Sequence, residues 1–233
     1  MRTVGGAVML ALLVVSGSPR AEGPPPAARL LVPRVAAPIR INAETAGKAA
    51  WNDDTGITRN FKDAAGNGMV PYTEAKVRWG DGTLYLLLYA GDLDLEGTVT
   101  SRDGPVLRDD AFHIELGREG HVYTLDVSVL GTLADADCTG SVGERSGERR
   151  CDWGWDSHAA VAVDRDGTLN QVGDNDEEWV VEMAIPLAKL GLKKPASGAR
   201  IPFSIRRCEI GHDGPHACGS WGTAPAGELV LDP

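Results

Sequence analysis

The sequence predicts an all-β protein, a single antiparallel β-sandwich of the jelly-roll-like kind. Three observations lead to this fold class. At least eight short stretches carry strand patterns, turn signals separate them at short spacing, and only one stretch, residues 186–190, has a helical signature. In that stretch a proline opens a turn that Gly191 closes.

The first half of the chain contains four predicted strands. In residues 74–79 apolar and charged side chains alternate, which is typical of a strand with one buried face. A Gly-Asp-Gly turn follows, and residues 84–89 are then almost wholly apolar, as in a strand covered on both faces. Residues 112–116 and 123–129 alternate again, on either side of a turn near Gly120. This succession predicts consecutive antiparallel hairpins.

The second half repeats the same pattern. Strands are predicted at residues 161–163, 179–185, 201–205 and 228–231. Residues 164–167 (Asp-Arg-Asp-Gly) are predicted to form a hairpin turn, and residues 174–176 the next turn. No internal repeat is present, so a single core is expected.

The amino-terminal residues have the order of a secretory signal peptide. Arg2 precedes an apolar run of about a dozen residues, too short to span a bilayer at ~20 residues, and small residues follow. We therefore divide the chain into a signal peptide (1–21), a proline-rich extended leader (22–38) and the sandwich (39–233). The mature protein is expected to be secreted, periplasmic or in the cell envelope, and no later segment is apolar enough to span a membrane.

The charge of the chain argues against nucleic acid as a partner. Acidic residues number 33 against 23 basic ones, a net charge of -10. Removal of the signal peptide takes away Arg2 and Arg20, leaving 21 basic residues and a charge of -12. Such a surface repels phosphate backbones unless a large basic patch is present, and the pairs Arg149/Arg150 and Lys193/Lys194 are too small.

The four cysteines favour two disulfides closed in sequence order. Cys138 with Cys151 and Cys208 with Cys218 each enclose a glycine-rich polar stretch. A zinc site of four thiolates is the alternative, but the chain lacks a C-x₂₋₄-C pair, and export favours oxidation.

The order of several short motifs resembles the family 9 carbohydrate-binding modules and related secreted sandwiches of the DOMON-like group. The resemblance extends over nearly all of residues 39–231. It is carried by residues 41–43 and 49–51, 75–88 with Asp92 and Asp94, 102–105, 109–115, Tyr123, 131–132, 168–170, 179–186, 220–221 and 227–231. Asn42-Ala43 stands where Asp-Gly is usual in the family.

The resemblance implies a non-catalytic, often calcium-containing sandwich that holds sugars between aromatic side chains and is often attached to glycoside hydrolases. The physical basis is that the apolar face of a sugar stacks on an indole while its hydroxyls meet polar groups. This chain departs from the pattern at the implied site. Leu107 replaces a tryptophan, His113 an acid and Thr124 an arginine, and residues 222–226 shorten the loop that carries the second tryptophan.

Other residues could supply a relocated sugar site. Trp153 and Trp155 alternate at period two, which would place both indoles on one face as a stacking platform. The competing interpretation is that they cover the core, since large aromatic side chains are usually buried. Trp51, Trp79 and Trp179 follow core periodicity, and Trp221 fits either role. The candidate carbohydrate contacts are therefore Trp153, Trp155, Trp221, His113 and Thr124.

Acidic pairs are candidate calcium ligands, because calcium takes six to eight oxygens from converging segments. Asp92 and Asp94 share a face near the end of a predicted central strand, and we expect them to be the ligands. Asp164 and Asp166 are better explained by turn chemistry.

Three other functions compete with that of a glycan-binding module. A cell-envelope structural or interaction domain would keep the scaffold without the sugar site. A haem-binding electron-transfer domain would use axial ligands from Met69, Met183, His113 and His121, with His212 and His216 in the second disulfide loop. A glycosidase would use two carboxylates such as Glu115 and Asp126, but 33 acids make chance pairs certain and no catalytic motif is present.

Overall fold

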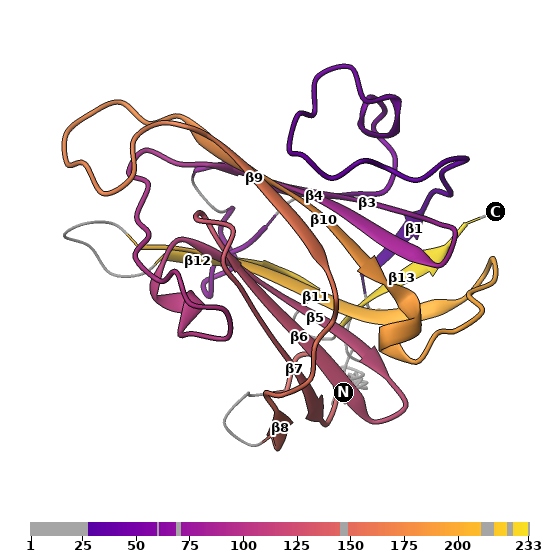
Figure 1. The fold of residues 1–233 in the computed structure, drawn as a ribbon. Helices are drawn as coiled ribbons and strands as arrows, with labels where there is room; N and C mark the ends of the chain where they lie inside the picture. The colour runs from indigo at the N-terminus through magenta and orange to yellow at the C-terminus, as the bar shows by residue number, and fades with distance from the viewer. Residues whose placement is uncertain are drawn as a thin grey trace, which may run out of the picture.

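Two β-sheets pack face to face as a sandwich (Figure 1). The computed structural model describes residues 28–59, 61–68, 71–144, 149–210, 217–222 and 226–232. Within these ranges no helix reaches seven residues. The all-β sandwich predicted from the sequence is confirmed.

The smaller sheet has five antiparallel strands in the order β2-β3-β4-β10-β9. Their bounds are β2 Ile57–Thr58, β3 Thr73–Gly80, β4 Thr83–Gly91, β9 Ala160–Asp166 and β10 Glu178–Pro186. A tight turn at Asp81 and Gly82, both with positive φ, joins β3 to β4. The side chains of this sheet therefore point either into the sandwich, the inner face, or away from it, the outer face.

The larger sheet has eight strands in the order β1-β13-β11-β5-β6-β7-β8, and β12 pairs with the remaining edge of β11. Their bounds are β1 Arg29–Val32, β5 Ala111–Arg118, β6 His121–Ser128, β7 Leu133–Thr139, β8 Cys151–Asp152, β11 Arg200–Glu209, β12 Ala217–Trp221 and β13 Gly227–Leu231. All pairs are antiparallel except β1 with β13. The central strands β11, β5 and β6 carry the site described below.

Short 3₁₀ turns replace helices in the connections. They are η1 (Ala49–Trp51), η2 (Val106–Arg108) and η4 (Leu187–Leu190). η4 ends at Gly191, whose φ of 75° lies in the left-handed region that favours glycine. The helical signature at residues 186–190 therefore produces a single 3₁₀ turn.

The core consists of the apolar side chains that alternate along the central strands. On β10 and β4, Trp179, Met183 and Leu86 are fully buried, and Phe112 and Ile205 face them from the larger sheet. The Trp179 and Phe112 rings lie 5.1 Å apart. Burial of this apolar area is the main stabilising contribution to the fold.

Two boundaries predicted from the sequence are wrong. The predicted leader contains β1, whose four residues pair with β13, so the sandwich begins before residue 39. Residues 164–166 continue β9 as a strand, and the connection to β10 starts at Gly167. The predicted signal peptide, residues 1–21, lies outside the described residues.

Both predicted disulfides are present, and no cysteine is free. Cys138 and Cys151 lie opposite each other on β7 and β8, and Cys208 and Cys218 do so on β11 and β12. A four-thiolate zinc site is therefore excluded. In the part of the chain that the structure describes, no helix has the length and apolarity needed to cross a bilayer.

Candidate functional site

The outer face of the larger sheet carries a cluster of polar side chains. His113 and Glu115 alternate along β5, and the register places Asp126 and Thr124 of β6 directly opposite them. On the other side, β11 brings Arg206 next to His113 and Ser204 next to Glu115. Thus His113 and Thr124, the two polar residues that the sequence singled out, lie on neighbouring strands of one surface. We refer to His113, Glu115, Thr124, Asp126, Ser204 and Arg206 as the outer-face cluster.

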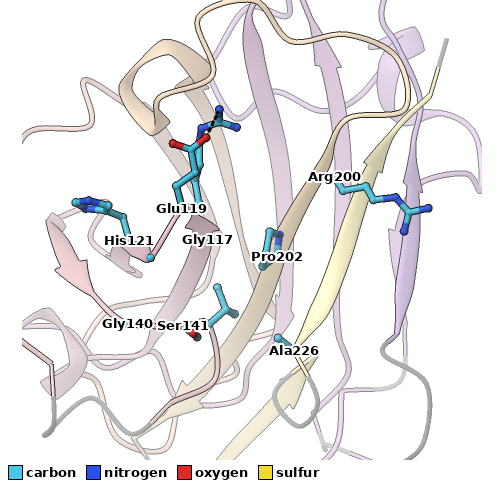
Figure 2. Close-up of a pocket in the computed structure, with 11 residues that line it drawn as sticks. Gly117, Glu119, His121, Gly140, Ser141, Arg200, Pro202 and Ala226 are labelled. Carbon is cyan, nitrogen blue, oxygen red and sulfur yellow. Dashed lines mark ion pairs between the residues drawn. The ribbon is translucent and has the colours of Figure 1, made fainter.

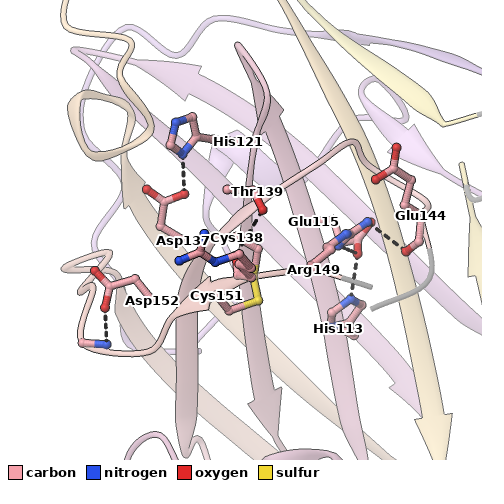
Figure 3. The surroundings of a disulfide bond; sticks show 12 residues. His113, Glu115, His121, Asp137, Cys138, Thr139, Glu144, Arg149, Cys151 and Asp152 are labelled. Carbon is pink, nitrogen blue, oxygen red and sulfur yellow. Dashed lines mark hydrogen bonds and ion pairs between the residues drawn. A yellow bond between two sulfur atoms is a disulfide. The ribbon is translucent and has the colours of Figure 1, made fainter. Parts of the chain in front are cut away.

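The carboxylate of Glu115 is the centre of this cluster (Figure 3). The Arg149 guanidinium donates to its Oε1 at 2.6 Å, and the backbone N–H of Gly143 donates to its Oε2 at 2.7 Å. The Ser204 hydroxyl donates at 3.2 Å. Only 6% of the Glu115 side chain and 2% of the Arg149 side chain are exposed. The two side chains therefore form a buried ion pair in which the carboxylate has several donors, while the Nε of Arg149 has no hydrogen-bond partner among the described residues.

His113 bridges two carboxylates. Its Nδ1 lies 2.5 Å from Asp126 and its Nε2 3.3 Å from Glu115. Burial opposes the charge of the ring, but hydrogen bonds to Asp126 and then Glu115 raise the pKa of His113 to about 9. Burial likewise opposes ionisation of Glu115, yet hydrogen bonds from His113, Arg149 and Gly143 lower its pKa to about 2. Both groups are charged at neutral pH.

These shifts predict how stability depends on pH. The stabilisation by His113 is complete below its ordinary pKa of 6.5 and is lost as the pH rises through about 9. The stabilisation by Glu115 is complete above its ordinary pKa of 4.5 and is lost as the pH falls through about 2. We therefore expect a decline in the free energy of unfolding between pH 6.5 and 9 that His113→Gln lacks. Urea titrations at several pH values in this range measure the free energy of unfolding of both proteins. An equal decline in the two proteins would show that His113 is not its source.

The segment after β7 covers the outer-face cluster. The Cys138–Cys151 disulfide ties its two ends to adjacent strands, and Val142, 7% exposed, packs over Gly117 and Pro202. A Cβ at position 117 would lie 2.8 Å from Val142 Cγ2, so glycine is needed for this close approach. The middle of the outer face is consequently occupied by the chain's own residues.

A pocket of about 500 Å³ remains open beside this cover (Figure 2). The turn between β5 and β6 forms one side, and the start of β11 and Ala226 form the other. Its floor is apolar or backbone, with Gly117, Val142 and Pro202, and its rim is polar, with Glu119, His121 and Ser141. Arg118 pairs with Glu119 at 2.8 Å, and Arg200 extends away from the other lining side chains. A volume of this size suits a small ligand that presents an apolar face and hydroxyl groups.

The two candidate tryptophans of the 151–156 segment do not lie on an extended strand. The backbone turns at Trp153 and Gly154, where Gly154 N–H donates to Asp152, so the period-two argument for a shared face fails. Trp155 packs on Tyr123 with ring centroids 5.0 Å apart, at the margin of the core. Trp153 is 57% exposed. Trp155 therefore covers the core, as the competing interpretation expects. Trp153 does not share a stacking surface with it.

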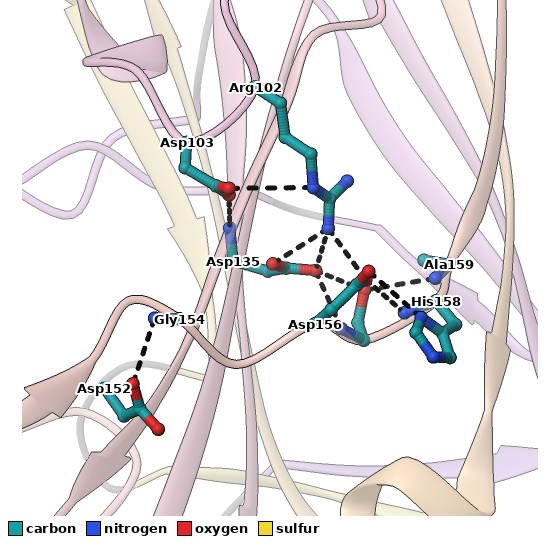
Figure 4. Close-up of polar contacts among 9 residues, drawn as sticks. Arg102, Asp103, Asp135, Asp152, Gly154, Asp156, His158 and Ala159 are labelled. Carbon is teal, nitrogen blue, oxygen red and sulfur yellow. Dashed lines mark hydrogen bonds and ion pairs between the residues drawn. The ribbon is translucent and has the colours of Figure 1, made fainter.

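A network of charges fixes this segment against β7 (Figure 4). Arg102 donates to Asp135 at 3.0 Å and to Asp156 at 2.8 Å. Asp135 is fully buried and also accepts a hydrogen bond from the backbone N–H of Ser157. This network has a structural role, because all its charges are paired within the chain.

The remaining sugar-site positions also have structural partners. Trp221 is half-buried and packs against Phe203, with ring centroids 5.7 Å apart. Leu107 joins a small apolar cluster with Val106 and Ala111 on the outer face. Thr124 is 7% exposed. None of these three side chains offers an open aromatic surface.

Asp92, one of the two expected calcium ligands, has another partner. Its carboxylate is fully buried and accepts hydrogen bonds from Arg207 at 2.9 Å and from the Trp179 indole at 3.0 Å. Asp94 N–H donates to the same carboxylate at 3.2 Å. Among the described residues no group of three or more His, Cys, Asp or Glu side chains is arranged to hold a metal ion. Calcium binding stays a prediction from the sequence.

The described haem-ligand candidates do not converge. His113 lies on the outer face of the larger sheet, and Met183 is fully buried on the inner face of the smaller one. His121 pairs with Asp137 at 2.7 Å. Met69, His212 and His216 lie outside the described residues. These positions do not fit a haem with two axial ligands.

The sandwich is shared with solved carbohydrate-binding proteins. A module of family 9 from Caldicellulosiruptor kristjanssonii, solved in complex with cellotriose, aligns with a TM-score of 0.56 at 18% identity, covering 88% of this chain and 93% of that one. The structure of a family 9 module from the same organism in complex with glucose gives 0.57 at 17% identity, covering 88% and 95%. This chain has the fold of a family 9 carbohydrate-binding module.

A third structure agrees. A Bacteroides uniformis protein to which carbohydrate binding has been attributed aligns with a TM-score of 0.61 at 16% identity, covering 89% of this chain and all of that one. No protein-family model matches the sequence, and no curated protein matches it. The family 9 fold is therefore evident in the three-dimensional structure at identities of 16–18%.

Proposed function

We propose that this chain is an exported carbohydrate-binding module that catalyses no reaction of its own and assists glycoside hydrolysis. One observation carries the proposal, namely the likeness of the sandwich to carbohydrate-binding modules over at least 93% of their length. The two disulfides support export, since such bonds persist in oxidising compartments.

The two carboxylates that the sequence offers as a glycosidase pair, Glu115 and Asp126, do not support catalysis. A glycosidase needs a general acid with a raised pKa. Glu115 instead has a lowered pKa of about 2 and is held by Arg149, Gly143 and Ser204. Asp126 is committed to His113. Neither group is available to protonate a glycosidic oxygen.

The pocket bounded by Gly117, His121 and Val142 is the proposed sugar site. It adjoins the surface on which His113 and Thr124 lie, and a pyranose could rest an apolar face on Pro202 and Val142 while its hydroxyls meet Glu119, His121 and Ser141. The site implied by the family resemblance is thus proposed to have moved along the sheet, away from the part covered by Arg149.

The test is binding of neutral oligosaccharides to matched histidine variants. His121→Ala removes a pocket side chain that is 48% exposed and paired with Asp137. His158→Ala removes a histidine that is 60% exposed and paired with Asp156, outside the pocket. We expect calorimetry to give about tenfold weaker binding for His121→Ala, as for loss of one hydrogen bond, and no change for His158→Ala.

The same experiment addresses the alternative, a cell-envelope domain that has lost sugar binding. That function is favoured by one observation, the occupation of the outer face by Arg149 and Val142. Failure of the wild type to bind any neutral glycan would support it over our proposal. Binding that His121→Ala leaves intact would keep the function but reject the pocket.

A further inference from the structure

The outer face of the smaller sheet presents an exposed pair of tyrosines. Tyr72 directly precedes β3 and is 52% exposed, and Tyr89 on β4 is half-buried. Their ring centroids lie 6.1 Å apart at an interplanar angle of 54°. The N–H of Gly91 donates to the Tyr72 carbonyl at 2.8 Å, which holds Tyr72 beside the end of β4. Large exposed aromatic side chains that cluster in this way are typical of binding surfaces.

The strand register surrounds these rings with carboxylates. Tyr89 lies between Glu74 on β3 and Val180 on β10, and Val180 is opposite Asp164 on β9. Two residues further along, and therefore on the same face, Gly91 is opposite Glu178 and Glu178 opposite Asp166. We refer to Tyr72, Tyr89, Glu74, Glu178, Asp164 and Asp166 as the tyrosine–carboxylate face.

The carboxylates contact the rings. The Tyr72 hydroxyl donates to Glu74 at 2.7 Å. Burial, a hydrogen bond to Glu178 and the charges of Glu178 and Glu74 raise the pKa of Tyr89 to about 12. The tyrosines and acids thus form one surface with a negative potential.

Few basic side chains balance this face. Arg59, whose charge reaches Tyr72, is paired with Asp54 at 3.0 Å. The next basic residues along β3 are directed elsewhere, because Lys76 donates to the Trp51 carbonyl and Arg78 to the Ala50 carbonyl. Among the described residues the face therefore has four acids, and Arg59, the basic side chain that hydrogen-bonds to Tyr72, is shared with Asp54. The net charge of the face is thus complementary to a cation.

We propose that the tyrosine–carboxylate face is a second glycan site and that it binds amino sugars with free ammonium groups. This inference rests on the proposed function, because it assumes that the ligand is a sugar. An aromatic ring attracts a cation placed over its face, and it also stacks on the apolar face of a pyranose. The surrounding carboxylates would pair with the ammonium group. An anionic sugar would be repelled. Because the pocket lies on the opposite sheet, one molecule could bind two glycan chains at once.

The test compares glucosamine oligomers with N-acetylglucosamine oligomers of equal length, which keep the ring but lose the charge. At a mildly acidic pH, where the amines of the oligomer carry a charge, we expect the free-amine oligomer to bind about tenfold more tightly, in line with a partly desolvated cation–π contact. Tyr72→Ala should abolish this preference, and Tyr72→Phe should retain it. Trp153→Ala is the control, because Trp153 is 57% exposed against 52% for Tyr72 and lies in the turn after β8 of the other sheet.

Three outcomes would overturn the inference. Equal affinity for the charged and acetylated oligomers would remove the amino-sugar class, and unchanged binding in both Tyr72→Ala and Glu178→Gln would remove the site. Tighter binding of oligolysine than of the glucosamine oligomer, lost in Tyr72→Ala, would replace the sugar with a basic peptide. His121→Ala separates this inference from the pocket, because it should weaken neutral-sugar binding without affecting the charged oligomer.

Discussion

Replacing Glu182 with alanine is expected to lower the free energy of unfolding by about 3–5 kcal/mol, the cost of leaving a buried charge without its partner. Glu182 lies on β10, on the outer face of the smaller sheet, and its side chain is fully buried. It accepts hydrogen bonds from the backbone N–H groups of Asn42 and Ala43, at 3.0 and 2.9 Å, and from the Trp51 indole at 2.8 Å. Lys48 donates to both carboxylate oxygens.

These contacts attach the segment before β2 to the sheet. Burial opposes ionisation of Glu182, but the hydrogen bonds from Lys48, Asn42 and Trp51 lower its pKa. Alanine would leave Lys48, whose side chain is 18% exposed, without its carboxylate partner. It would also leave two backbone N–H groups and the Trp51 indole without acceptors. Chemical denaturation measures the effect.

Glu228 provides the control for this prediction. It accepts ion pairs from Arg29 and Arg200, but its side chain is 24% exposed and those of the arginines are 55% exposed. Exposed pairs contribute about 0–1 kcal/mol, so Glu228→Ala should have a small effect. A loss in Glu182→Ala no larger than in Glu228→Ala would show that Glu182 does not anchor the segment.

The second large effect is expected at the buried ion pair between Asp92 and Arg207. Neither side chain is exposed. Asp92→Ala would leave the guanidinium with Glu209, at 3.4 Å, as its remaining ion-pair partner, and we expect a loss of about 3–5 kcal/mol. Burial raises the pKa of Asp92, so the pair is held by its geometry at a considerable desolvation cost.

A double-mutant cycle separates this pair from simple loss of packing. If Asp92 mainly serves Arg207, the double variant Asp92→Leu/Arg207→Met should cost less than the sum of the two single variants, because neither charge of this pair is left buried without the other. Additive losses would refute the coupling. The cycle also tests whether Asp92 has a structural role as the partner of Arg207, and this test needs no metal ion.

Strands with strong apolar alternation were predictable from the sequence, and those stabilised by distant polar partners were not. β3, β5, β6 and β10 follow the expected periodicity, and β4 coincides with the continuous apolar run. β7 shows no apolar alternation because its inner face carries Asp135 and Asp137, acids that hydrogen-bond to Arg102 and His121 from other segments. β1 was assigned to the leader because four residues among prolines give no periodic signal, and its pairing with β13 is long-range.

The candidate site was predictable only in part. His113 and Thr124 do share a surface with Glu115. Arg149, however, contacts Glu115 from 34 residues away in the sequence. The only sequence feature that marks Arg149 is its place in a pair of basic residues next to Cys151. The shared face expected for Trp153 and Trp155 required an extended backbone, whereas the hydrogen bond from Gly154 to Asp152 makes a turn. The pocket combines backbone from the β5–β6 turn and β11, and no local motif marks it.

The most direct measurement is an NMR titration of the labelled protein with a neutral oligosaccharide, following each backbone amide. If the chain is a carbohydrate-binding module with its site in the pocket, the largest shifts will fall on Gly117, Gly120, His121, Ser141 and Val142. Shifts centred on Trp153 would move the site to the segment after β8. No shift with any neutral glycan, in a protein that is folded, would contradict the proposed function itself.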